Sequence, residues 1–376
     1  MGTTAGDRQG QSHSLLRLLS TDARVSVNDL ADRLNTSKAN ALASLSNTTK
    51  ERSLRFVPEI SIDKVWKWEF IKRARVRTKR GILAEAVDEL PATGFEEYVM
   101  LARFKGGKPG DAEIQKAIGG HYAAQFAARL KGDDDLLVYA VDRSYDDMMR
   151  FVEGVSKKLG HYRMLASITR VWNTFGFFPL SDALVEQFDI FDTYKKLLVG
   201  LNGNGRGTFT EIGNRFRQGA AQMLYAYDRL VRTEILKRVT YFEPLRGRQA
   251  IVAMARTADA SGFADAKSAW FASLVKEYEK RENECVYMCD TPSPLGMLVI
   301  ASFESSKALS RFVATMRGKL VNSEISYMPI SRVLHGSLGI RDFDMSKTQQ
   351  YRHLERNRLL PEEPKAAEPV ENPDAI

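Results

Sequence analysis

A run of short polar side chains on one predicted helix is the part of the sequence best suited to contacting another molecule. An asparagine can bond the edge of adenine twice, a lysine can reach guanine or phosphate, and short side chains let a helix enter the major groove of DNA. We therefore predict DNA contacts along this helix, although the solvated face of a structural helix bundle would have the same composition. The residues expected to face outward are Ser37, Lys38, Asn40, Ala41, Ser44 and Asn47.

Two predicted helices and a sharp turn hold that face in position. Ser26 and Asp29 have the spacing of a capping box, so a short helix is expected from about residue 27 to residue 34. Ser37 is the expected N-cap of the second helix, and a leucine-rich helix precedes both. This order is typical of a helix-turn-helix unit. The expected inner stripe of the second helix consists of Ala39, Leu42 and Leu45.

Positive charge is concentrated directly behind these helices. The whole chain has a formal net charge of +8. Residues 50–80 alone contain eleven basic residues against four acidic ones, which leaves a local net charge of +7. Such a cluster attracts phosphates, and it would also attract a membrane surface or an acidic protein. From this stretch we expect Arg52 and Arg55 to contact DNA.

Other chemistry is poorly represented. The sequence lacks the motifs of P-loop, dinucleotide-binding, serine-hydrolase and zinc-protease sites, and no histidine lies at catalytic spacing from a carboxylate or a second histidine. Cys285 and Cys289 have no further metal ligand nearby, so we interpret them as structural thiols. The glycines at 203–207 lack a Lys-Ser/Thr pair and are interpreted as a flexible turn. We expect no catalytic residues, no metal and no cofactor, and we predict that the protein is not an enzyme.

The chain contains an internal duplication. At a constant offset of 161 residues, eight identical pairs run from Leu137 and Leu298 to Leu159 and Leu320. A second block, at an offset of 182, repeats the helix-turn-helix stretch together with its capping box. Two order-preserving blocks with matching caps are not expected by chance, so the sequence predicts two copies of one unit.

The order of elements within each copy gives the fold class. From residue 95 the periodicity follows the order βαββαβ, which is that of a ferredoxin-like sandwich. We predict an α+β protein made of two copies of a winged helix-turn-helix followed by a βαββαβ ferredoxin-like sandwich. Residues 63–78 fit a helix and a strand equally well. The expected domains are 14–60 (winged helix-turn-helix, DNA-binding), 61–94 (basic and aromatic connector), 95–180 (ferredoxin-like effector and assembly domain), 188–245 (second, divergent winged helix-turn-helix), 246–342 (second ferredoxin-like domain) and 343–376 (acidic, proline-rich tail, largely disordered).

The second helix-turn-helix carries a different outer face. Gln222, Tyr225, Ala226 and Arg229 replace the short polar set of the first copy. This helix either reads another DNA sequence or serves in packing. We favour packing or weak phosphate contact.

These features resemble the Lrp/AsnC (leucine-responsive) family of prokaryotic transcription regulators, in particular its archaeal members. The resemblance covers about residues 14 to 340, as two fused copies. It is carried by ARVSVNDLADRLNTSKANALASL in the helix-turn-helix and by LKGDDDLLVYAV, which contains a Gly-x-x-Asp turn in the central hairpin of the first sandwich. In that family the first domain binds DNA, and the sandwich forms dimers and holds an amino acid or similar effector near the hairpin turn.

The resemblance implies both partners and sites. The partners are double-stranded DNA and an amino acid-like effector, and the chain is expected to form a homo-oligomer or an intrachain pseudo-dimer. We expect a cytoplasmic, nucleoid-associated protein without a membrane segment. The hairpin of the second copy, DTPSPLGMLVI, lacks the Gly-x-x-Asp turn, so no second effector site is expected. The implied contacts are with DNA at Ser37, Lys38, Asn40 and Ser44, and with the effector near Gly132 and Asp135.

Two other functions fit parts of the pattern. Siroheme decarboxylases are similar to this family in architecture, and such an enzyme would need His and Arg groups lining a tetrapyrrole cleft. An architectural protein would coat DNA through the basic stretch alone, with steep salt dependence and little sequence preference. A regulator would keep a specificity ratio of about 10³ or more over random DNA at the same salt. A DNA-binding regulator is the function that we predict from the sequence.

Overall fold

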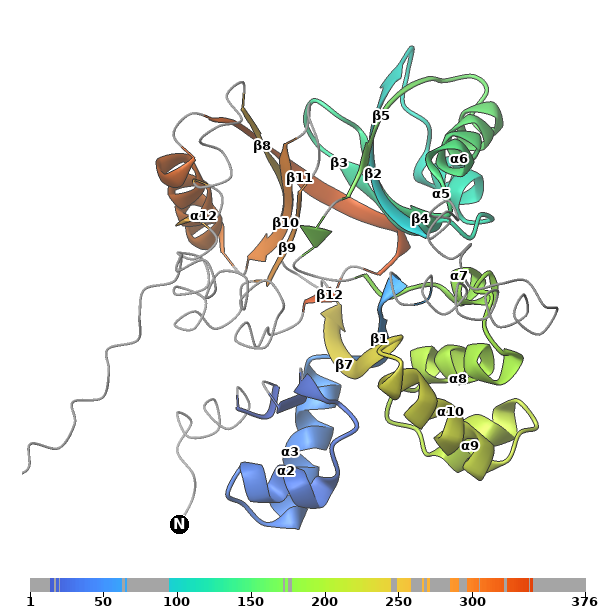
Figure 1. The fold of residues 1–376 in the computed structure, drawn as a ribbon. Coiled ribbons are helices and arrows are strands. Elements are labelled where there is room, and N and C mark those ends of the chain that lie inside the picture. Colours follow the sequence, from blue (N-terminus) through green and yellow to red (C-terminus); the bar gives the residue numbers. More distant parts are fainter. Residues whose placement is uncertain are drawn as a thin grey trace, which may run out of the picture.

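The protein has an α+β structure in which a curled β-sheet with its helices lies above a smaller layer made mostly of helices (Figure 1). The α+β class is the predicted one. The connector at 61–94 and the tail at 343–376 lie almost wholly outside the part of the chain that is described. This computed structural model describes residues 14–16, 18–19, 21–62, 65, 95–171, 173–174, 178–244, 249–257, 266, 269–270, 285–290, 296–303, 305–320, 323–337 and 339–340.

The first half of the large sheet has the strand order of a ferredoxin-like fold. Its antiparallel strands lie in the order β5-β2-β4-β3. Ser144 begins helix α6, because its hydroxyl accepts a hydrogen bond from the backbone N–H of Asp147. The elements follow the predicted order: β2 (Glu96–Lys105), α5 (Asp111–Ile118), β3 (Ala124–Leu130), β4 (Leu136–Asp142), α6 (Tyr145–Lys158) and β5 (Arg163–Arg170).

The second half has the corresponding strand order, β11-β8-β10-β9. Ser305 caps its helix α12 in the way that Ser144 caps α6. The described elements are β8 (Gln249–Thr257), β9 (Cys285–Asp290), β10 (Met297–Phe303), α12 (Ser306–Lys319) and β11 (Ser323–Gly336).

The nine-stranded sheet is curled, and its two edge strands are consecutive in the chain. The second part of β11 pairs with β3 and so joins the two halves. The short strand β6 (Asn173–Thr174) pairs with β9 at one edge of the sheet, whereas β5 lies at the other edge. Arg170 ends β5 only three residues before Asn173, so their Cα atoms lie within about 11 Å of each other. The chain thus passes directly from one edge of the sheet to the other.

Side chains alternate between an inner and an outer core. Along β2, Val99 and Leu101 belong to the core enclosed by the sheet, whereas Tyr98 and Met100 pack against α5 and α6. Strand β8 alternates in the same way, with Ile251 on the side of α12. The inner core contains side chains from both halves and continues into the helices below.

The lower layer holds two helical units, which we call the first head and the second head. In each head, a Ser or Thr side chain caps the helix that comes just before the last helix of that head. The Ser26 hydroxyl accepts a hydrogen bond from the backbone N–H of Asp29, and the Thr208 hydroxyl accepts one from the backbone N–H of Glu211. A short helix that we did not predict, α7 (Asp182–Glu186), leads into the second head. The first head comprises α2 (Val27–Arg33), α3 (Lys38–Glu51) and β1 (Arg55–Ile60), and the second comprises α8 (Asp192–Gly203), α9 (Phe209–Arg215), α10 (Ala220–Arg232) and β7 (Leu236–Pro244).

The two heads are joined by a three-stranded sheet. Strand β1 pairs antiparallel with β7, and β12 (Gly339–Ile340) pairs with the other side of β7. Pro58 fits in β1 because this strand lies at an edge, where one side needs no ladder hydrogen bond. Gly205 lies against the first head: its N–H donates to the carbonyl oxygen of Phe56 (3.1 Å), and a Cβ there would come within 2.6 Å of that oxygen. Residues 205–206 form a turn, as predicted, and Gly205 is held there by its contact with the first head.

Two arginines reinforce the junction reciprocally. The Arg24 guanidinium donates to the carbonyl oxygens of Gly205 (2.8 Å) and Gly207 (3.0 Å) in the second head. Arg206 in turn donates to the carbonyl oxygen of Ala23 in the first head. Burial lowers the pKa of both arginines, yet an arginine stays charged in proteins. Arg24 and Arg206 are 182 residues apart, which is the offset that relates the two heads in the sequence.

Candidate nucleic-acid interface

Helix α3 presents one full side to solvent. Ser37 begins it, because the Ser37 hydroxyl accepts a hydrogen bond from the backbone N–H of Asn40 (3.2 Å). Ala41, Leu45 and Thr48 form its buried side, and the first two join the core of the first head. The exposed side includes Ala39, Asn40, Ala43, Asn47 and Lys50, and Lys38 is exposed as the first residue of the helix.

The buried stripe of α3 differs from the predicted one. Ala41 is fully buried, so the prediction that it faces outward toward DNA is wrong. Leu42, expected in the core, is 53% exposed, and Ala39 is exposed as well. A helix with about 3.6 residues per turn keeps one face only when spacings of three and four alternate. The buried residues 41, 45 and 48 follow that rule, whereas the predicted stripe with two spacings of three does not.

The other predicted DNA-contacting residues of α3 lie as follows. Lys38, Asn40 and Asn47 are exposed, as DNA contact requires. Ser37 is exposed too, but its hydroxyl already caps the helix. Ser44 is only partly exposed.

Of the two basic residues predicted to contact DNA after α3, Arg55 contacts the second head. Arg52 is the C-cap residue of α3 and is partly buried. Arg55 begins β1, and its guanidinium lies 6.0 Å from the ring centroid of Phe242 in the second head. Strand β1 thus pairs with the other head and does not project as a free wing. Of the predicted 50–80 basic stretch, only residues 50–62 and 65 are described.

The second head shows a different face at the same place. Met223, Ala226 and Leu230 form the buried side of α10. Gln222 is exposed, as are three apolar side chains, so the outer face of α10 does not pack within the described part of the chain. The exposed fractions are 46% for Leu224, 60% for Tyr225 and 39% for Val231.

The predicted effector residues lie in the hairpin between β3 and β4. Gly132 has a φ of +156° and lies against Met328 of β11, where a Cβ would come within 2.7 Å of the Met328 Cγ. The Asp135 carboxylate is buried and accepts a hydrogen bond from the backbone N–H of Phe104 (2.9 Å). The Lys108 Nζ lies 2.5 Å from the other Asp135 oxygen. Burial alone would raise the pKa of Asp135, but the bonds from Lys108 and Phe104 outweigh it and lower that pKa.

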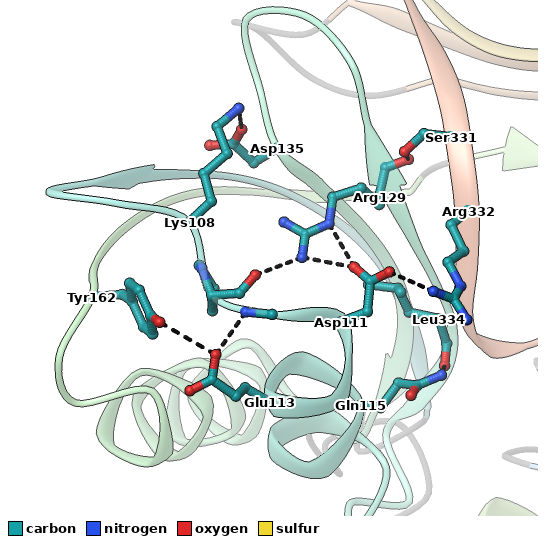
Figure 2. A network of polar contacts seen from close by, with 12 residues as sticks. Lys108, Asp111, Glu113, Gln115, Arg129, Asp135, Tyr162, Ser331, Arg332 and Leu334 are labelled. Atoms are coloured by element: carbon teal, nitrogen blue, oxygen red, sulfur yellow. Dashed lines mark hydrogen bonds and ion pairs between the residues drawn. The ribbon is translucent and has the colours of Figure 1, made fainter.

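A polar network that we did not predict joins the two halves of the sheet at the β3–β11 seam (Figure 2). Arg129 on β3 bonds one oxygen of Asp111 through Nε (2.9 Å), and Arg332 on β11 bonds the other (3.0 Å). The Arg129 bond is the main cause of a lowered pKa for Asp111. This network ties the N-terminus of α5 to both halves of the sheet.

His121 and His335 make local contacts, and His161 is exposed. Nδ1 of His121 accepts a hydrogen bond from the backbone N–H of Ala123 (3.2 Å), and its ring stacks on Tyr122. Burial lowers the pKa of His121. The His335 Nε2 lies 3.1 Å from the carbonyl oxygen of Ala124. Within the described ranges, no group of three or more His, Cys, Asp or Glu side chains has the arrangement of a metal site, and no helix is long and apolar enough to cross a membrane.

Known proteins resemble this chain in structure only. No protein-family model and no curated protein matches its sequence. The structure of the siroheme decarboxylase NirDL is similar to this one, with a TM-score of 0.54 at 10% sequence identity. The matched region covers 93% of this chain and 99% of the NirDL chain. The same enzyme in co-complex with an iron-uroporphyrin III analogue gives a TM-score of 0.51 at 10% identity over the same shares. An AsnC family transcriptional regulator from Agrobacterium tumefaciens covers 44% of this chain and 92% of its own, with a TM-score of 0.33 at 14% identity.

The likeness over nearly the whole length shows a shared fold, and it corrects one prediction. We predicted that the protein is not an enzyme, and this is contradicted because an enzyme, the siroheme decarboxylase NirDL, shares the fold over 93% of this chain. The prediction failed because it rested on missing motifs, and those motifs belong to other reaction classes.

Proposed function

We propose that this protein is a transcription regulator of the Lrp/AsnC type that reads duplex DNA with its first head. The observation that carries the proposal is the exposed side of α3, where Lys38, Asn40, Asn47 and Lys50 share one helix. Lysine and asparagine are suited to base edges and phosphates in the major groove. The net charge of +8 favours association with a polyanion.

In this proposal the chain is a pseudo-dimer made by duplication of a winged helix-turn-helix and a ferredoxin-like sandwich. Three features support the duplication. The two halves of the sheet have corresponding strand orders, both heads use the same type of cap, and the arginines of the head junction are reciprocal.

We also propose an effector site at the β3–β4 hairpin. The Asp135 carboxylate already forms an ion pair with the ammonium group of Lys108, and the Lys108 side chain is 65% exposed. The ammonium group of an amino acid would compete for the same carboxylate. The Asp135→Asn variant should therefore lose the rise in melting temperature that a binding amino acid gives the wild type. An equal rise in both proteins would contradict this site.

Binding to promoter fragments of the source genome across a salt series tests the main proposal. The double variant Lys38→Ala/Asn40→Ala should lose preference for the best fragments, by about 10-fold to 100-fold in affinity, and keep weak general binding. Lys307→Ala removes an exposed charge on α12, far from the heads, and serves as the matched control. Equal binding of every fragment by all three proteins would instead indicate an architectural role. Absence of binding at low salt would refute DNA binding altogether.

A siroheme decarboxylase-like enzyme is a second candidate, favoured by the full-length likeness to NirDL. In this chain the fully buried Asp142 accepts a hydrogen bond from the Tyr122 hydroxyl (2.7 Å), and its second oxygen has no partner. If the protein binds such a macrocycle, titration with iron-uroporphyrin III should change the visible spectrum. Mass spectrometry of the recovered macrocycle would then show loss of CO₂. An unchanged spectrum at high protein concentration would exclude it.

A further inference from the structure

We propose that helix α10 is a second DNA-reading surface, that it prefers A·T-rich duplex, and that the joined heads hold it at a fixed spacing from α3. This inference rests on the proposed DNA-binding function and extends it to the second head. It differs from the packing role that the sequence favoured.

Helix α10 occupies the same position in its head as α3 does in the first. At the offset of 182, the buried Ala41 and Thr48 of α3 correspond to the buried Met223 and Leu230 of α10. The exposed Leu42 likewise corresponds to Leu224. The two helices therefore turn equivalent sides to solvent.

The outer side of α10 is more apolar than a solvated helix needs. Leu224, Tyr225 and Val231 are each more than one-third exposed and lie within two turns of one helix. Single exposed apolar residues are common, but a cluster on one face marks a contact surface. Ala220 and Ala221 at the start of the helix leave room for close approach to a partner.

The side chains of α10 fit A·T base pairs. A glutamine can bond adenine through N6 and N7, and apolar groups contact the methyl group of thymine. Gln222 and Leu224, both exposed in the first turns of α10, can supply these two contacts. Helix α3 instead offers Lys38 for guanine and Asn40 for adenine. The two heads would thus read different half-sites.

The charge of the second head favours DNA over a protein partner. Residues 205–238 hold seven basic residues against three acidic ones, which leaves a net charge of +4. Arg217 lies three positions before the first residue of α10, and Arg232 is the last residue of that helix. Both side chains are exposed. Cations at both ends of a reading helix are placed to neutralise phosphates on either side of a groove.

The junction of the heads fixes the spacing between α3 and α10. Strands β1 and β7 pair in register, and Arg24 and Arg206 each bond backbone carbonyls of the opposite head. Two reading helices held in one body require half-sites at one helical phase, and about 10 to 10.5 base pairs make a full turn of DNA. Inserting five base pairs therefore places the second half-site on the opposite side of the duplex.

Selection from a random duplex library tests the inference. The full-length wild type should enrich a two-part sequence with one A·T-rich part. The variant Gln222→Ala/Tyr225→Ser should lose enrichment of that part alone, and its affinity for the selected duplex should fall about 10-fold to 100-fold. The variant Lys38→Ala/Asn40→Ala should lose the other part. Unchanged melting temperatures of both variants show that they are folded, and Lys307→Ala is the control.

Each result has one meaning. If the α10 variant enriches the same two-part sequence as the wild type, α10 does not read DNA and the inference is overturned. If the α10 variant also abolishes a concentration-dependent dimer seen by sedimentation, the face binds a second copy of the chain instead. If the wild type enriches no sequence at all, the proposed function itself fails. If a five-base-pair insertion leaves affinity unchanged, the fixed spacing is refuted.

Discussion

The two heads share their buried contacts and differ on the side that faces solvent. Both begin a helix with a Ser or Thr cap, and each sends an arginine to backbone carbonyls of the other. Both outer faces expose a leucine, Leu42 or Leu224, but α3 has Ala43 at the place where α10 exposes Tyr225. Contacts that hold the heads together constrain both copies alike, whereas a surface residue is free to change with its partner. The differing faces are therefore where function is to be sought.

The largest effect is expected at the close contact between the heads. Gly205→Ala should lower the free energy of unfolding by about 2 to 3 kcal/mol, as overpacking does, because the new Cβ would lie 2.6 Å from the Phe56 carbonyl oxygen. Denaturant unfolding measures this change. Gly154→Ala is the control, since nothing lies within 4 Å of a Cβ there. Equal stability of the two variants would show that the heads are not in contact in solution.

The reciprocal arginines should contribute equally. Arg24→Met and Arg206→Met each remove charge-assisted hydrogen bonds to carbonyls, so each should cost about 2 kcal/mol of stability. The double variant should cost less than the sum of the two if the arginines act on one junction. Thermal unfolding of the three variants measures both expectations. Loss of stability in only one single variant would break the symmetry between the heads.

The seam of the sheet differs from the head junction because it depends on a titratable group. The pKa of Asp111 is lowered in the folded state, so its contribution to stability is present above the unfolded-state pKa and is lost as pH falls through the folded-state pKa. Asp111→Asn should therefore melt below the wild type at pH 6, and the gap should narrow as the pH falls below about 4. A gap that stays constant with pH would contradict this role.

The smallest effects on stability are expected on the outer faces. Leu42→Ser and Leu224→Ser replace side chains that are about half exposed, so each should change stability by less than about 0.5 kcal/mol. Their effects on DNA binding should differ, with Leu224→Ser weakening only the A·T-rich half-site. Similar effects of both variants on the same half-site would remove the distinction between the heads.

Local features could be predicted from the sequence, and long-range pairing could not. The caps at Ser26 and Ser37 and the βαββαβ order follow from side chains a few residues apart, and the structure contains them. The orientation of α3 was misjudged at Ala41 and Leu42, because small and polar residues give a weak helical period. The pairing of β6 with β9 joins residues more than 100 positions apart and has no local signal at all.

In the candidate interface, too, local features could be predicted and long-range contacts could not. Exposure of Lys38, Asn40 and Asn47 follows from the helix pattern. The junction made by Arg24, Arg206 and Gly205 joins residues about 180 positions apart, and the only hint was that the two arginines fall at equivalent positions of the duplicated stretch. Equivalent charged residues in two copies thus deserve testing as a reciprocal contact.

Hydroxyl-radical footprinting of the full-length protein on its best-binding fragment tests the central claim most directly. We expect two protected segments at one fixed spacing, and the Lys38→Ala/Asn40→Ala variant should lose protection of one of them. Protection that spreads evenly along the fragment, unchanged in the variant, would contradict the claim that the first head reads DNA.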